Sequence, residues 1–84
     1  MENHNELREQ VMAIIDNQLR DNNPPETKIT YERLRREGFD DFDTRQLIGQ
    51  CLAVELFDVF TQGKPFDEER YVKNLSALPK EPFD

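Results

Sequence analysis

Residues 40–63, DDFDTRQLIGQCLAVELFDVFTQG, form the longest stretch of the chain with apolar residues at helical spacing. The apolar side chains fall on two arcs of the expected helix. The first arc consists of Ile48, Leu52, Leu56, Val59 and Phe60, and the second of Leu47, Val54 and Phe57. A helix that is apolar on several sides normally lies at the centre of a bundle, in contact with more than one neighbour. The sequence therefore predicts a central helix in this stretch.

Acidic and glycine residues mark the two ends of this helix. Asp40 fits the N-cap position, and so does Asp43, which has Gln46 at the third helical position after it. We favour Asp40 as the cap. Gly63 can adopt the left-handed conformation that commonly ends a helix, so we expect the helix to stop there.

Two helices are expected before the central one. Apolar residues recur on one face of residues 4–21, at Leu7, Val11, Ile14, Ile15 and Leu19. A second helix is expected from Pro25 to about Glu37, because proline suits the first helical position, where its missing N–H would have no acceptor. Gly38 follows as its terminating residue.

A fourth helix is expected after Asp67, which fits its N-cap. Its buried stripe consists of Tyr71, Val72, Leu75 and Leu78, and Pro79 closes it. No segment alternates apolar and polar residues long enough to make a strand. The sequence therefore predicts an all-α fold: a single compact domain over residues 1–84, bundle-like, with four helices and the third one central. Residues 79–84 carry too little apolar surface to order alone, so we expect a frayed tail.

Gly49 lies inside the central helix, where glycine costs about 0.5–1 kcal/mol relative to alanine. Ala53 follows one turn later, so the two small residues make a shallow groove that another helix can approach closely. We predict that the first helix fills this groove through Val11, Ile14 and Ile15.

The charge balance is strongly acidic, with eighteen acids, eleven bases and a net charge of −7 over 84 residues. Such a charge repels the phosphate backbone of nucleic acids and anionic membrane surfaces. Only residues 24–38 are basic, at +1, against −8 for the remainder. If the central helix entered a DNA groove, Asp40, Asp41 and Asp43 at its start would meet phosphates. We therefore expect neither a nucleic-acid nor a membrane partner.

Cysteine and histidine each occur once, as Cys51 and His4. A single cysteine cannot form an intrachain disulfide, which favours a reducing compartment. The first twenty residues lack the basic and apolar regions of a signal peptide, so we expect a complete cytoplasmic protein. His4 and Cys51 alone cannot supply the three or four ligands of a zinc site. We interpret Cys51 as buried packing and His4 as a half-exposed end of the first apolar stripe.

Acidic clusters do not complete a metal or catalytic site either. Counted from Asp41, the sixth position of a calcium loop is Gln46 instead of glycine, and the twelfth is Leu52 instead of glutamate. Glu55 and Asp58 resemble half of a carboxylate metal site, but the Glu-x-x-His pairing is missing. We interpret these two as a solvated face. The sequence thus predicts no catalytic residue, no cofactor and no metal, and hence no enzyme.

Five short segments, in this order, carry a resemblance to a known group of proteins. They are His4, LREQV at 7–11, YERL at 31–34, CLA at 51–53 and GKPFDEERY at 63–71. Over residues 4–78 the chain resembles the helical part of small uncharacterised prokaryotic proteins grouped as a domain of unknown function. The resemblance implies a prokaryotic cytosolic protein and supplies no activity.

By elimination, the predicted function is a non-catalytic protein–protein interaction module, which binds either another copy of itself or another protein. Its expected surface combines the basic end of the second helix with apolar residues left over on the central helix. The residues are Arg33, Arg36, Leu47, Val54 and Phe57.

The alternative function is an accessory or regulatory subunit whose small-molecule or metal site forms only at a subunit interface. In that case a second copy of His4, and of Glu55 or Asp58, would supply the missing ligands.

Overall fold

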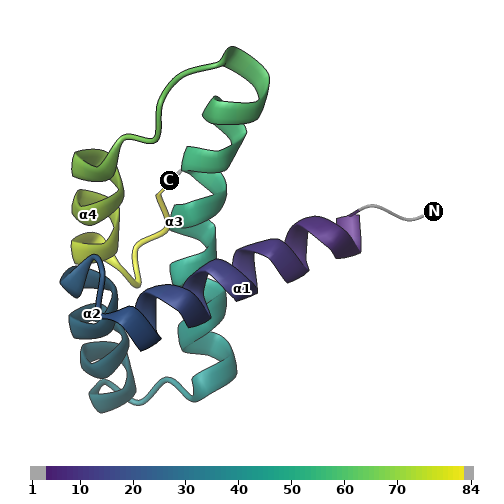
Figure 1. The fold of residues 1–84 in the computed structure, drawn as a ribbon. Helices are drawn as coiled ribbons and strands as arrows, with labels where there is room; N and C mark the ends of the chain where they lie inside the picture. Colours follow the sequence, from purple (N-terminus) through teal and green to yellow (C-terminus); the bar gives the residue numbers. More distant parts are fainter. Residues whose placement is uncertain (1–3, 83–84) are drawn as a thin grey trace.

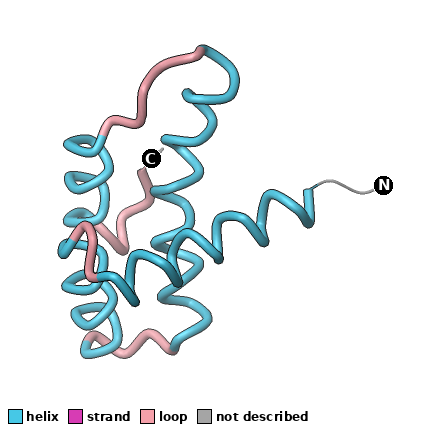
Figure 2. Tube along the Cα trace, in the orientation of Figure 1, coloured by secondary structure: helices cyan, strands magenta, loops and turns pink. Residues whose placement is uncertain are grey.

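The computed structural model describes residues 4–82, with side chains from Glu6 onward, and this part of the chain is helical with no strand (Figures 1 and 2). Its helices are α1 (His4–Asp21), α2 (Pro25–Arg36), α3 (Asp41–Gln62) and α4 (Glu68–Ala77). The predicted all-α class and the four helices are confirmed.

The helices pack around α3, which contacts α1, α2 and α4. Figure 1 shows α2 and α4 following one another along one side of α3, while α1 crosses α3 obliquely and its N-terminal half extends beyond the bundle. The central position of the third helix is confirmed. α2 shares it, because α2 also contacts each of the other three helices.

Every helix contributes to one apolar core. Its buried members are Val11, Ile15, Leu34, Ile48, Cys51, Leu52, Tyr71, Leu75 and Leu78. Cys51 is completely buried there, as predicted, and burial raises the pKa of its thiol to about 12. The thiol is therefore protonated at neutral pH and is not a nucleophile.

The helix ends follow the local signals in the sequence. The Asp40 carboxylate accepts from the backbone N–H of Asp43 at 2.8 Å, so Asp40 is the N-cap of α3. After α2, Gly38 adopts a φ of +107°, and the N–H of Phe39 donates to the carbonyl of Leu34 at 3.1 Å. These bonds pair backbone groups that the helix itself leaves without partners.

The predicted groove on α3 is filled at Gly49 and left open at Ala53. A Cβ at Gly49 would lie 3.2 Å from Cγ1 of Val11 and 3.8 Å from Cδ1 of Ile15, both on α1. Ala53, one turn further on, is exposed. The prediction is right for Val11 and Ile15 at Gly49, where the other of the three nearest atoms belongs to Met12 and not to Ile14. It is wrong for Ala53, which stays exposed because α1 crosses α3 at an angle.

The chain after α4 turns back toward α3. Nε2 of Gln50 donates to Oε2 of Glu81 at 3.2 Å, and Glu81 and Pro82 are half-buried. The predicted frayed tail covers 79–84, of which residues 83 and 84 lie outside the described part.

Candidate functional site

An exposed apolar surface lies where α1 diverges from α3, and we call it the Ala53 face. It is defined by Leu7 on α1 and by Ala53, Phe57 and Phe60 on α3. The side chains of Leu7, Phe57 and Phe60 are 45%, 63% and 66% exposed. Spacings of four and three residues put the three α3 members on one side of that helix. Large apolar side chains that are exposed together, and not singly, mark interaction surfaces.

Three hollows adjoin Ala53, with volumes of about 340, 240 and 280 Å³. Each pair of hollows shares one larger side chain that lies between them. Gln50 lines the first and the second hollow, Leu7 lines the second and the third, and Phe57 lines the third and the first. Ala53 lines all three. The surface is therefore a small residue ringed by larger side chains, with a depression between each pair.

The predicted surface residues of α3 divide between this face and the core. Phe57 is exposed, and Val54 is half-buried and lines the first hollow. Leu47 instead packs against the core. Phe60, which the sequence pattern assigns to the arc with Ile48, is instead exposed and lines the third hollow together with Leu7 of α1. Leu7 of α1 also belongs to the Ala53 face, although its helical spacing in the sequence predicted that it would pack in the core.

The interpretation of Glu55 as part of a solvated face is wrong. Its side chain is 1% exposed, and Nη2 of Arg70 donates to it at 3.1 Å. Asp58 is also bound by Nη2 of Arg70, at 2.7 Å. Glu55 also accepts from Nε of Arg70, at 2.5 Å, and from the backbone N–H of Asp67, at 3.0 Å. The two carboxylates face α4, so their partner lies in a different helix and a pattern within α3 cannot reveal it.

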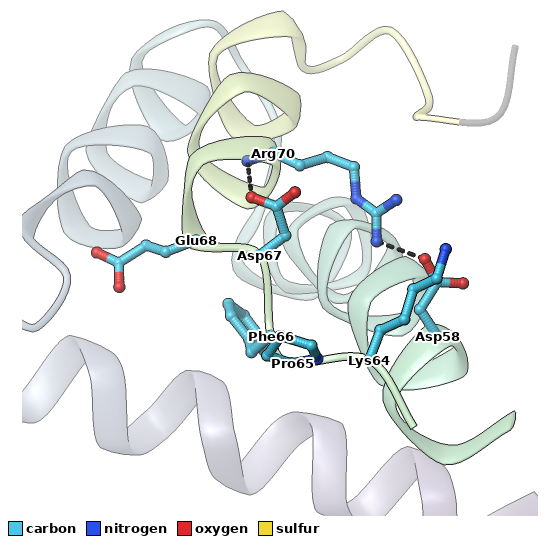
Figure 3. Close-up of a pocket in the computed structure, with 7 residues that line it drawn as sticks. All are labelled: Asp58, Lys64, Pro65, Phe66, Asp67, Glu68 and Arg70. Carbon is cyan, nitrogen blue, oxygen red and sulfur yellow. Dashed lines mark hydrogen bonds and ion pairs between the residues drawn. The ribbon is translucent and has the colours of Figure 1, made fainter. Parts of the chain in front are cut away.

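The cluster around Arg70 borders a pocket of about 440 Å³ at the start of α4, shown in Figure 3. In the figure the Arg70 guanidinium points toward Asp58, and the Asp67 carboxylate turns back to the backbone N–H of Arg70, at 3.0 Å, as the N-cap of α4. The hydrogen bonds that Arg70 donates to Glu55 and then to Asp58 raise the pKa of Arg70, so this group stays charged. These polar groups form hydrogen bonds with one another, and the bonds hold the 63–67 loop in place.

The two predicted arginines differ in their surroundings. Arg33 donates through Nη2 to the carbonyl of Leu75 in the last turn of α4 and through Nη1 to Glu37, both at 3.1 Å. Its guanidinium is thus engaged within the fold. Arg36 is exposed at the C-terminal end of α2.

A buried hydrogen-bonded triad, which the sequence patterns do not indicate, joins three helices. The hydroxyl of Tyr71 on α4 and that of Thr27 on α2 donate to Oε1 of Gln18 on α1, at 2.8 and 2.7 Å. The two hydroxyl oxygens are 3.2 Å apart. Burial raises the pKa of Tyr71 to about 12. A neutral tyrosine that bonds only to neutral groups acts here as a structural tie.

The remaining candidates do not assemble into a site. His4 begins α1, but its side chain lies outside the described residues. Within the described part of the chain, no group of three or more His, Cys, Asp or Glu residues is arranged to hold a metal ion.

None of the four helices described combines the length and the apolar character needed to cross a membrane. Comparison of the chain with models of known families, with curated proteins and with solved structures finds no match.

Proposed function

We propose that this protein is a non-catalytic interaction module that binds a protein partner through the Ala53 face. The observation that carries the proposal is the joint exposure of Leu7, Phe57 and Phe60 around the hollows at Ala53. Burial of apolar surface is the main favourable term in protein association, at about 25 cal/mol per Å². Aromatic side chains are enriched among the residues that contribute most to such interfaces.

The state of the reactive groups supports a binding role over a catalytic one. Glu55 and Asp58 are bound by Arg70, and Cys51 and Tyr71 are buried in their neutral forms. A general acid, base or nucleophile must reach its substrate.

The single, buried cysteine also fits the reducing cytoplasm, which we propose as the location.

The alternative of a ligand site shared between subunits receives less support, because two of the three residues that it names, Glu55 and Asp58, are engaged within the fold. Both Glu55 and Asp58 already bind Arg70, and Glu55 is buried, so a second subunit cannot use these carboxylates without breaking the cluster. Of the five residues expected at the surface, the proposal keeps Val54 and Phe57.

Site-specific photocrosslinking in the native cell tests this function. A photoreactive phenylalanine analogue replaces Phe57, and in a matched control it replaces Ile29, which is 61% exposed on α2 and therefore equally accessible. A discrete adduct with one protein from position 57 and none from position 29 is the expected result. Identical adduct patterns from both positions, or no adduct from either, would contradict a specific binding face.

A further inference from the structure

We draw no further inference here: the strongest candidate, the exposed apolar surface around Ala53 where α1 diverges from α3, carries nothing beyond the proposed function, because nothing in the structure shows what covers it.

Discussion

The carboxylate of Glu55 is buried in α3, yet the guanidinium that binds it, on Arg70 of α4, is 39% exposed. The same carboxylate accepts from the backbone N–H of Asp67, so a single side chain of α3 fixes both the residue that caps α4 and the first turn that follows. The two partners of this ion pair therefore have unequal access to water, and removing one is not equivalent to removing the other.

We predict that Arg70→Ala lowers the free energy of unfolding by more than Glu55→Gln does, because it leaves the buried Glu55 carboxylate without its cation. Glu55→Gln should cost less, about 1–2 kcal/mol, since the amide oxygen still accepts from Asp67 and water can solvate Arg70. The double variant should be more stable than Arg70→Ala alone. Urea unfolding measures all three. Arg20→Ala, in an exposed ion pair with Asp21, serves as a control with an effect below about 1 kcal/mol. A cost for Arg70→Ala no larger than that for Glu55→Gln would contradict the proposed asymmetry.

The close approach of α1 to Gly49 has its own test. Because an added Cβ would lie 3.2 Å from Val11, Gly49→Ala should not give the stabilisation of about 0.5–1 kcal/mol that helix propensity predicts for an exposed site. Gly49→Leu should lower the free energy of unfolding by about 1–3 kcal/mol through overpacking. Ala53→Leu, at the exposed position one turn later, is the matched control and should change it by less than about 0.5 kcal/mol. A gain of about 0.5–1 kcal/mol from Gly49→Ala would show that α1 does not restrict the site.

Reactivity of the single thiol reports on the core around Cys51. Burial raises the pKa of this thiol from 9.0 to about 12, so almost no thiolate is present at pH 8. We expect a disulfide reagent to modify the native protein at pH 8 only as fast as the core opens, and the protein in concentrated urea within the mixing time. Absorbance of the released thiol follows both reactions. Equal rates with and without urea would place the thiol at the surface.

Ionisation of Tyr71 predicts a loss of stability at alkaline pH. Its pKa is raised from 10.0 to about 12, chiefly by burial, so the unfolded chain ionises first as pH rises. The stability that this difference contributes is complete below pH 10 and is lost as pH approaches 12, by about 1.4 kcal/mol per pH unit. Tyr71→Phe loses the hydrogen bond to Gln18 at a cost of about 1 kcal/mol at pH 8, but it lacks this alkaline loss.

The difference between wild type and Tyr71→Phe should therefore narrow between pH 10 and pH 11. Urea unfolding of both proteins across this range measures it. A difference in the free energy of unfolding that stays constant with pH would contradict the raised pKa of Tyr71 in the folded state.

Sequence patterns identify the parts of this fold that depend on neighbours within one helical turn. The Asp40 cap, the left-handed Gly38 and the Asp67 cap were all predictable because each bonds to backbone three to five residues away. Gly49 also indicated close helix packing. Glycine inside a helix lowers the stability of that helix, and the close contact of a second helix compensates for this loss.

The exposed and buried sides of α3 were less predictable, because they depend on the angles between helices. Glu55 has the polarity of a surface residue, and only the position of Arg70 on another helix accounts for its burial. Phe60 has the spacing of a core residue, yet it is exposed and only borders a hollow that Leu7 of α1 also lines. Helical periodicity gives the relative direction of side chains on one helix, but it does not say where the neighbouring helix ends.

The contact between Arg33 and the carbonyl of Leu75 explains why an acidic chain concentrates arginines at one place. Carbonyl groups at the end of a helix carry a partial negative charge equivalent to about half an electron. Arg33 belongs to the last turn of α2 and reaches the last turn of α4, so the negative ends of two helix dipoles meet beside one cation. Arg35 and Arg36 lie in the same turn. Arg33 thus compensates the backbone at the ends of two of the protein's own helices.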